Sequence, residues 1–578
     1  MLQNAGAKIL NIFYPTKRSY EISACNLTIR TKLHFLACNL TITPQKTLLT
    51  LLVCFLGVGA MGQNLDTIPY FSTDSMPNAG IYLPAPPDTC SQLFIDDFQQ
   101  WLWGKSMRGT ARGQQASWES LYSVDRMCGI YSEALGFVVS REATPAIYRL
   151  ISRGQKTAAQ AVDPAKAKYM RKRPFARMNE HVAGAFDNEE ELRGNGSYPS
   201  GHTSLGWTTA LIMAQMAPEL QDTILRRGWE YGESRVIVGA HWQSDVDAAR
   251  LAASAAVARL QASPEYQADM AAARVEYLLW HGTVPANVGY PNGRRILPPP
   301  IDTASYRYQG DVAAHWMAKA ERGTARGAQA SADAASKYHH FLSQFSSCLN
   351  LQLDTVATPH IAAYLKYVRN TLKNESGRLK DSYFRKRPYV QLAESTLIPE
   401  EEESHATTSS YPSSHATFGW GLALAMVELT PDSMNAVLQR GFEYGRSRVI
   451  AGYHWTSDVQ AARLVAAYTL VRLQRDSTFQ ALLDSARAEY ALLRGHTAIA
   501  PRTPGNDPLL HQVDNTVTLT FTGQPVHGTL NLYSVDGRLM STQTVNSNTS
   551  VNLSSLPHGV YIVTFTGKDR FCSLKAVY

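Results

Sequence analysis

Tyr231-Gly232-Glu233-Ser234-Arg235-Val236-Ile237 is a heptapeptide that recurs 213 positions later as Tyr444-Gly445-Arg446-Ser447-Arg448-Val449-Ile450. A second segment, Arg-Gly-Thr-Ala-Arg-Gly at residues 108–113, recurs at residues 322–327, a shift of 214. Leu-Pro-Ala-Pro at residues 83–86 has a similar counterpart, Leu-Pro-Pro-Pro, at residues 297–300. A period of this length is far too long for a solenoid repeat, so the pattern predicts a whole domain that occurs twice.

The duplication and the composition of the connecting segments divide the 578-residue chain into parts. Segments rich in Pro, Gly and Asn separate the two repeats from each other and from the C-terminal part. We predict an N-terminal extension with a signal peptide at 1–62, a first domain at 80–283, a linker at 284–295, a second domain at 296–494, a linker at 495–512 and a β module at 513–578.

The two repeats have the pattern of helical domains, and the C-terminal part does not. Residues 207–217, 248–260 and 461–473 are rich in Ala, Leu and Met with polar residues at intervals, which predicts helices. Residues 517–522 alternate with period two, Asp536-Gly537 is a turn pair, and residues 561–565 form a further apolar run. The predicted fold class is therefore mainly α, with two tandem all-α domains followed by a small all-β sandwich.

Composition excludes several classes of protein. Hydrophobic residues make up 44% and charged residues 18%, which is ordinary for a folded chain and excludes a mainly disordered one. The net charge is +7, from 55 basic and 48 acidic residues without long basic runs, so we expect no nucleic-acid partner. The seven cysteines lack the spacing of a zinc site, and we expect no metal and no cofactor. Cys90 and Cys128 lie in the same repeat and are candidates for a disulfide bond.

The N-terminal part contains a candidate export signal. Residues 48–61 form a short apolar run behind Lys46 and end among small residues, with cleavage expected near Gly62 and Gln63. The run is shorter than the roughly 20 residues that span a bilayer, and a membrane anchor is the alternative. We therefore predict an exported protein, in the periplasm, at the cell surface or outside the cell, with no integral membrane domain after signal removal.

Three clusters of polar residues occur in the same order in both repeats. The first cluster is Lys166 with Arg173, the second contains Ser200, Gly201 and His202, and the third contains Arg235, His241 and Asp245. Their counterparts in the second repeat are Lys380, Arg387, Ser413, Ser414, His415, Arg448, His454 and Asp458. A single histidine or Arg-Pro pair carries little information, whereas three clusters with fixed spacing, in one order and twice in one chain, indicate a functional site.

The residue types predict a pocket for a phosphate or a similar oxyanion. Guanidinium groups and a lysine match tetrahedral oxyanions, and a loop that leads into a helix N-terminus offers backbone N–H groups. His241 and Asp245 are four residues apart and would share a face on a helix, so that the carboxylate fixes the imidazole tautomer. His241 could then attack phosphorus to form a phosphohistidine, while His202 protonates the leaving oxygen and later activates water.

At these residues the sequence resembles the type 2 phosphatidic acid phosphatase superfamily, and within it the bacterial class A non-specific acid phosphatases. Gly196-Ser197-Tyr198-Pro199-Ser200-Gly201-His202-Thr203 matches the signature octapeptide of that class. The resemblance implies an all-α acid phosphatase/haloperoxidase-like fold and a nucleophile at His241 or His454, oriented by Asp245 or Asp458. It implies His202 or His415 as the acid, and phosphate binding by Lys166, Arg173, Ser200, Gly201, Arg235, Lys380, Arg387, Ser413, Ser414 and Arg448.

The second repeat departs from this pattern at two positions. Ser414 replaces Gly201 and is expected to narrow the pocket or strain the loop, and Arg446 replaces Glu233 and makes its surroundings more basic. We expect both sites to be active with different specificities, and the two repeats to pack together as an intramolecular pseudo-dimer.

The predicted function is that of a secreted phosphatase that hydrolyses small soluble phosphomonoesters at mildly acidic pH without a metal ion. Mild acidity is expected because a histidine acid with a pKa near 6.5 must be protonated while the nucleophile is neutral. The alternatives are a vanadate-dependent haloperoxidase, which shares the three clusters, a lipid phosphatase, and a chain with one catalytic repeat and one binding or structural copy.

The C-terminal module resembles the sorting domain of the type IX secretion system. The resemblance rests on residues 530–538, 553–556 and 559–561 and on Lys575 near the end. It implies that the secretion machinery is a partner of this module, and a small adhesive or carbohydrate-binding domain is the alternative.

Overall fold

The structure is a computed structural model, and it describes residues 65–184, 189–285, 287–335, 337–494, 508–521, 527–534, 539–567 and 571–578. The predicted signal segment at 48–61, its cleavage point, and the turn at Asp536-Gly537 lie outside the described residues.

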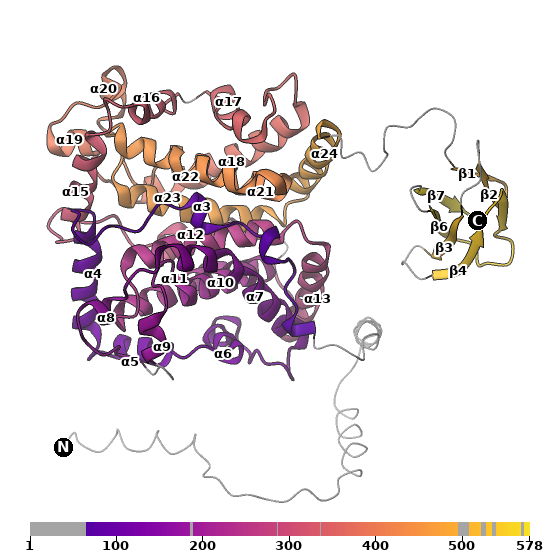
Figure 1. The fold of residues 1–578 in the computed structure, drawn as a ribbon, viewed down its shortest axis with the longest axis horizontal. Helices are drawn as coiled ribbons and strands as arrows, with labels where there is room; N and C mark the ends of the chain where they lie inside the picture. The colour runs from indigo at the N-terminus through magenta and orange to yellow at the C-terminus, as the bar shows by residue number, and fades with distance from the viewer. Residues whose placement is uncertain are drawn as a thin grey trace, which may run out of the picture. The chain divides into compact units, whose positions relative to one another are not determined.

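The first repeat consists of helices from α3 to α13 (Figure 1). They are α3 (Ala79–Tyr82), α4 (Phe94–Met107), α5 (Ala111–Trp118), α6 (Val124–Leu135), α7 (Pro145–Tyr169), α8 (Pro174–Arg177), α9 (Glu189–Gly194), α10 (Gly201–Met216), α11 (Gln221–Ile237), α12 (Gln243–Leu260) and α13 (Pro264–His281). The short 3-10 turns η1 (Leu65–Thr67), η2 (Thr73–Ser75) and η3 (Pro218–Leu220) complete it.

The second repeat has the same order of helices, from α14 to α24. They are α14 (Gly293–Ile296), α15 (Tyr308–Lys319), α16 (Ala325–Ala332), α17 (Tyr338–Leu349), α18 (Pro359–Ser382), α19 (Pro388–Leu392), α20 (Glu402–His405), α21 (Ser414–Leu429), α22 (Met434–Ile450), α23 (Thr456–Leu473) and α24 (Ser477–Leu493), with η4 (Pro399–Glu401) and η5 (Pro431–Ser433). The prediction of a mainly α fold with two helical repeats is confirmed.

Each repeat is built around one helix that is apolar on almost every side, α10 in the first and α21 in the second. A helix without a polar face can only be stable when other helices surround it. Accordingly, α10 packs against α7, α11 and α12, and α21 packs against α18, α22 and α23. Gly206 permits the close approach of α11, since a Cβ atom there would lie 2.2 Å from the Tyr231 ring.

The two repeats contact each other through reciprocal segments. The α3 helix of the first repeat contacts α22 of the second, and α14 of the second contacts α11 of the first. The backbone N–H of Asn78 donates to Oδ1 of Asn435 at 2.8 Å, and that of Asn292 donates to Oδ1 of Asp222 at 2.7 Å. Since these four residues occupy matching positions in the two repeats, each repeat offers the other the same contact.

The C-terminal module contains two antiparallel sheets. One sheet has the strand order β1-β2-β5 and the other β4-β3-β6-β7. The strands are β1 (Pro508–Val513), β2 (Thr516–Phe521), β3 (Gly528–Ser534), β4 (Leu539–Val545), β5 (Thr549–Asn552), β6 (Val560–Gly567) and β7 (Phe571–Val577). Alternate residues of β2 are buried, as the period-two pattern predicts. Strand β1 begins inside the range interpreted as a linker, because Leu510 pairs with Leu519 of β2.

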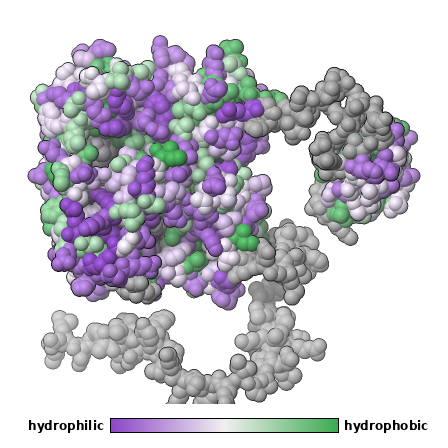
Figure 2. Space-filling model, viewed as in Figure 1, coloured by the Kyte–Doolittle hydropathy of each residue, from purple (hydrophilic) through white to green (hydrophobic). Residues whose placement is uncertain are grey.

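The described helices have a mixed surface. The visible face of the helical repeats is largely hydrophilic, with apolar residues scattered over it (Figure 2). Among the described residues, no helix combines the length and the apolar composition that a bilayer crossing requires.

Cys90 is exposed and Cys128 is buried, and both are free thiols. The suggested disulfide between them is therefore wrong, because neither sulfur is bonded to another cysteine.

Candidate active site

The residues of the first cluster set converge from five elements of the first repeat. Lys166 lies in the last turn of α7, Arg173 directly precedes α8, and Arg235 lies in the last turn of α11. His202 is the second residue of α10, and His241 lies in the loop between α11 and α12. The three clusters, which are far apart in sequence, thus meet at the ends of the helices that surround α10.

His241 is held by a hydrogen bond on each side of its ring. Its Nδ1 lies 2.9 Å from the carbonyl oxygen of Ser197, and its Nε2 lies 2.8 Å from Nη1 of Arg173. Because a carbonyl oxygen only accepts and a guanidinium only donates, Nδ1 carries the proton and Nε2 the lone pair. Burial and the charge of Arg173 lower the pKa of His241 well below its usual value. The neutral imidazole therefore presents the nitrogen that holds its lone pair to Arg173.

The predicted helical pairing of His241 with Asp245 is wrong in its local geometry. His241 precedes α12, and Asp245 is the third residue of that helix, where its Oδ2 accepts the backbone N–H of Trp242 at 2.8 Å. The carboxylate still lies 3.5 Å from Nδ1 of His241. Asp245 therefore caps the helix start and faces the histidine at the same time, because the capping turn folds the loop back over the helix end.

Arg171 holds the Asp245 carboxylate in the ionised state. Its Nη1 donates to Oδ1 of Asp245 at 2.6 Å, and its Nη2 donates to Oδ2 of Asp97 at 2.7 Å. Burial alone would raise the pKa of Asp245, but the charge of Arg171 and the hydrogen bonds from His241 and Ser197 lower it well below its usual range. The result is a buried chain of charges, Asp97, Arg171 and Asp245, that ends at His241.

The sequence interpretation missed Arg171, Asp97 and Ser197. The signal that would have found them is the duplication itself. They recur as Arg385, Asp311 and Ser410, with shifts of 214, 214 and 213. Arg385 donates to Asp458 at 2.6 Å and to Asp311 at 2.7 Å, so the second repeat contains the same chain of charges.

Lys166 and Arg173 share one acceptor. Nζ of Lys166 donates to the carbonyl oxygen of Gly196 at 2.9 Å, and Nη2 of Arg173 donates to the same atom at 3.5 Å. Burial, followed by the charge of Arg173, lowers the pKa of Lys166 to about 7. Burial likewise lowers the pKa of Arg173 to about 10. Two desolvated cations this close favour a ligand with at least one negative charge.

The third cation of each site is a fully buried arginine. The side chain of Arg235 is 0% exposed, and its Nη1 donates to the carbonyl oxygen of Glu119 at 3.5 Å. In the second repeat, Nε and Nη1 of Arg448 are buried and have no hydrogen-bond partner within the described part of the chain. A buried guanidinium is costly unless an anion accepts its hydrogen bonds, so these arginines also favour an oxyanion.

The second histidine of each site is partly buried and neutral. Nε2 of His202 lies 3.1 Å from the carbonyl oxygen of Ser120, and Nε2 of His415 lies 3.2 Å from that of Ala334. Nε2 therefore carries the proton, and Nδ1 holds the lone pair. Burial, followed by the charge of Arg235, lowers the pKa of His202 well below its usual value. A further negative charge in the pocket is needed to raise that pKa.

Ser200 and Gly201 form the start of α10. The Ser200 hydroxyl oxygen accepts the backbone N–H of Thr203 at 3.3 Å, which makes Ser200 the N-cap. A Cβ atom at Gly201 would lie 3.6 Å from Cε of Lys166, which is an ordinary contact. The expected strain at Ser414 is therefore wrong: this helical position accepts a side chain, and Ser376 donates a hydrogen bond to the Ser414 hydroxyl at 3.3 Å.

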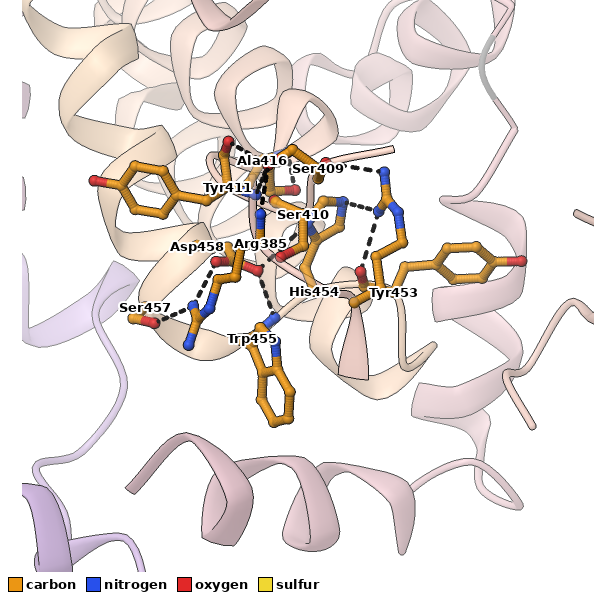
Figure 3. Close-up of polar contacts among 12 residues, drawn as sticks. Arg385, Ser409, Ser410, Tyr411, Ala416, Tyr453, His454, Trp455, Ser457 and Asp458 are labelled. Atoms are coloured by element: carbon orange, nitrogen blue, oxygen red, sulfur yellow. Dashed lines mark hydrogen bonds and ion pairs between the residues drawn. The ribbon is translucent and has the colours of Figure 1, made fainter. Parts of the chain in front are cut away.

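The second site repeats the arrangement of the first (Figure 3). Nδ1 of His454 lies 2.8 Å from the carbonyl oxygen of Ser410, and its Nε2 lies 3.1 Å from Nη1 of Arg387. Nζ of Lys380 donates to the carbonyl oxygen of Ser409 at 2.8 Å, and burial lowers its pKa to about 7. All sixteen residues predicted from the sequence thus belong to two matching clusters.

The environment of the second histidine, His202 or His415, differs between the sites. The Tyr122 ring makes an edge contact with His202, and its hydroxyl donates to Gln155 at 2.6 Å. In the second repeat, Arg369 occupies the position of Gln155, and its guanidinium lies 5.0 Å from the rings of Phe341 and Phe418, which adjoin His415. Within the described ranges, no group of three His, Cys, Asp or Glu side chains is placed so that it could hold a metal ion.

Both repeats and the C-terminal module match known protein families. Residues 155–266 and 361–478 match the PAP2 superfamily, and residues 513–577 match the secretion system C-terminal sorting domain. These matches cover the clusters described above and the two β-sheets. The sorting domain indicates export.

Curated relatives cover one repeat of the chain. The chain is 40% identical over 220 residues to a non-specific acid phosphatase of Providencia stuartii, which is 37% of this chain and 88% of that protein. It is 38% identical over 209 residues to a non-specific acid phosphatase of Salmonella typhi, which is 36% of this chain and 83% of that protein. It is 35% identical over 194 residues to an acid phosphatase of Zymomonas mobilis, which is 34% of this chain and 73% of that protein.

Proposed function

The chain belongs to the PAP2 superfamily, among relatives that are acid phosphatases, and from this premise we propose that it is an exported, metal-independent acid phosphatase with two active sites. The observation that carries the proposal is the pair of matching pockets. In each pocket two buried arginines and a partly buried lysine surround a neutral histidine whose Nε2 carries the lone pair. Its substrates are small soluble phosphomonoesters.

Substrate binding replaces contacts within the protein by contacts to the phosphate. The ester phosphate accepts hydrogen bonds from Lys166, Arg173 and Arg235, and from the backbone N–H groups at the start of α10. Arg173 then no longer donates to Nε2 of His241, and the lone pair of this nitrogen is available to phosphorus. The negative charge of the phosphate also raises the pKa of His202, so that Nδ1 gains a proton while Nε2–H stays on the Ser120 carbonyl.

The phosphoryl group is transferred to His241 in a first step and to water in a second. Nε2 of His241 forms a bond to phosphorus as the bond from phosphorus to the ester oxygen breaks, and His202 gives its Nδ1 proton to the leaving alcohol. Asp245 and the Ser197 carbonyl stabilise the positive charge on the His241 ring. In the second step, Nδ1 of His202 takes a proton from water, whose oxygen displaces the histidine from phosphorus and releases phosphate. The three cations stabilise the charge of the transferring group throughout.

The reciprocal contacts between α3 and α22 and between α14 and α11 support an intramolecular pseudo-dimer. Each of its two sites is formed by residues of one repeat, so each site can bind substrate independently of the other. The C-terminal module delivers this unit through the secretion machinery.

Phosphate release from p-nitrophenyl phosphate by the full chain, measured across pH, tests the proposal. We expect hydrolysis at mildly acidic pH that persists in EDTA and is blocked by vanadate, and an acid-labile phosphate on His241 or His454 after rapid quenching. Loss of activity in EDTA would overturn metal independence. Halide oxidation with vanadate and peroxide, without phosphate release, would overturn the phosphatase mechanism.

A further inference from the structure

A cavity of about 630 Å³ lies between the two repeats. Its walls include Leu83, Pro84 and Leu251 from the first repeat and Val449, Val459 and Arg463 from the second. None of the sixteen predicted site residues lines it. This volume lies within the usual range of roughly 300–1,000 Å³ for small-molecule sites, so the cavity can enclose a compact organic ligand.

The charged side chains of the cavity wall are paired, with one buried exception. The pairs are Asp96 with Arg307, Asp97 with Arg171, Asp311 with Arg385, Asp247 with Arg250, and Glu321 with Arg446. Asp88 is exposed. Arg463 is 5% exposed and makes no ion pair with the described part of the chain. The wall therefore carries one buried positive charge that no carboxylate neutralises.

The first repeat shows what the second repeat lacks. Arg250 is the counterpart of Arg463, and its Nη1 donates to Oδ1 of Asp247 at 3.1 Å. In the second repeat, Gln460 occupies the position of Asp247, and Arg446 occupies that of Glu233. Because of these two differences, Arg463 lacks, among the described residues, the acidic groups that lie around Arg250.

Arg463 is held in place without being neutralised. Its Nη2 donates to the carbonyl oxygen of Phe442 at 2.7 Å, and its guanidinium lies 3.9 Å from the Phe442 ring centre. Its Nε is buried and has no hydrogen-bond partner among the described residues. Burial lowers the pKa of Arg463 to about 9, which leaves it cationic at neutral and acidic pH. An isolated buried charge is costly, and an anion beside it removes that cost.

We propose that this cavity binds a small organic anion whose carboxylate, sulfonate or phosphate group pairs with Arg463. The apolar body of the ligand packs against Leu83, Pro84 and Val449. This site lies apart from the two phosphate pockets and does not depend on the proposed phosphatase mechanism. Because both repeats form its walls, an occupant also bridges them.

Titration of the full chain with 1-anilinonaphthalene-8-sulfonate, an aromatic sulfonate that fluoresces in apolar surroundings, tests the site. We expect saturable binding that is weakened about tenfold or more in Gln460→Asp, because the new carboxylate pairs with Arg463 as Asp247 pairs with Arg250. Gln439→Asp adds the same charge on the exposed side of α22, outside the cavity, and should bind like the wild type.

The far-ultraviolet circular dichroism of each variant reports whether its helices are folded. Equal affinity of the wild type and a folded Gln460→Asp, or the absence of saturable binding to the wild type, would overturn the proposal. If Gln460→Asp does not fold, Arg463→Gln takes its place with the same expected loss. Equal weakening by Gln439→Asp would mean that only the net charge matters, and this also contradicts the site.

Discussion

The two repeats keep the same site and differ in how its surroundings are supported. Both contain a histidine between a backbone carbonyl and an arginine, at 2.9 and 2.8 Å in the first repeat and 2.8 and 3.1 Å in the second. The Ser197 hydroxyl donates to Asp245, whereas the Ser410 hydroxyl donates to the carbonyl oxygen of Lys386 at 3.4 Å. The contacts of the histidine are therefore the same in both repeats, whereas the hydroxyl of the neighbouring serine has a different partner in each.

A second difference concerns a buried carboxylate that makes the same contacts in both repeats although the residue is different. Glu119 in the first repeat pairs with Arg227 and accepts a hydrogen bond from Ser234. Its counterpart Asp333 is one methylene shorter and makes the same two contacts with Arg440 and Ser447. Because long arginine side chains can adjust their reach, the buried carboxylate at this position is preserved although the residue is not.

The largest expected effect comes from the two histidines that we propose as nucleophiles. We expect His241→Ala combined with His454→Ala to lower the rate of p-nitrophenyl phosphate hydrolysis by about 10⁴-fold or more, since the covalent step is lost. Each single variant should keep the part of the activity that the unchanged repeat contributes. Full activity in one single variant and none in the other would show that only one repeat is catalytic. The two sites would then not be equivalent.

The lysines should make both sites fail at high pH. The pKa of Lys166 and of Lys380 is about 7, so each lysine is cationic below pH 7 and loses its charge as the pH rises through that value. We expect KM to rise about tenfold per pH unit above pH 7 for each site, measured in the background in which the other nucleophile is alanine. Lys166→Arg should abolish this rise at the first site only. A pH-independent KM would contradict the lysine assignment.

The serine beside the proposed nucleophile should distinguish the repeats. Ser197→Ala removes a hydrogen bond to Asp245 and should lower kcat of the first site about tenfold, with KM nearly unchanged. Ser410→Ala is the matched control and should change kcat of the second site less than about twofold, because its hydroxyl does not reach Asp458. Equal losses in both repeats would mean that the difference between the two serines has no consequence.

The smallest effect concerns stability. Ser200 and Ser413 cap α10 and α21, with capping distances of 3.3 and 3.4 Å. Replacing either serine with alanine should lower the free energy of unfolding by about 1 kcal/mol, measured by urea denaturation. A loss in one repeat of more than about twice that in the other would show that the helix starts are not equivalent.

Local patterns were sufficient to predict most of the fold and the residues of the candidate site. The duplication, the helical character of residues 207–217, 248–260 and 461–473, and the period-two pattern at 517–522 all agree with α10, α12, α23 and β2. These features are encoded by periodicity and spacing within one segment. The roles of the site residues remain predictions, although the structure brings all of them together.

The predictions that failed depended on geometry that spacing does not encode. Residues four apart share a helix face only if both lie in the helix, and His241 lies before it. Ser414 was expected to strain a loop, but its position is the first residue of α21. Cys90 and Cys128 lie in one repeat but differ in burial.

By itself, the sequence determined that a helical domain occurs twice, that each copy carries the same polar residues, and that a β module follows. Repetition and periodicity are properties of the order of residues, so they need no coordinates. Only the tertiary structure decided that Arg171 and Asp97 lie behind Asp245, that the repeats contact each other, and that Arg463 has no carboxylate partner among the described residues. These facts depend on distances between residues far apart in the chain, which are set when the helices pack around α10 and α21.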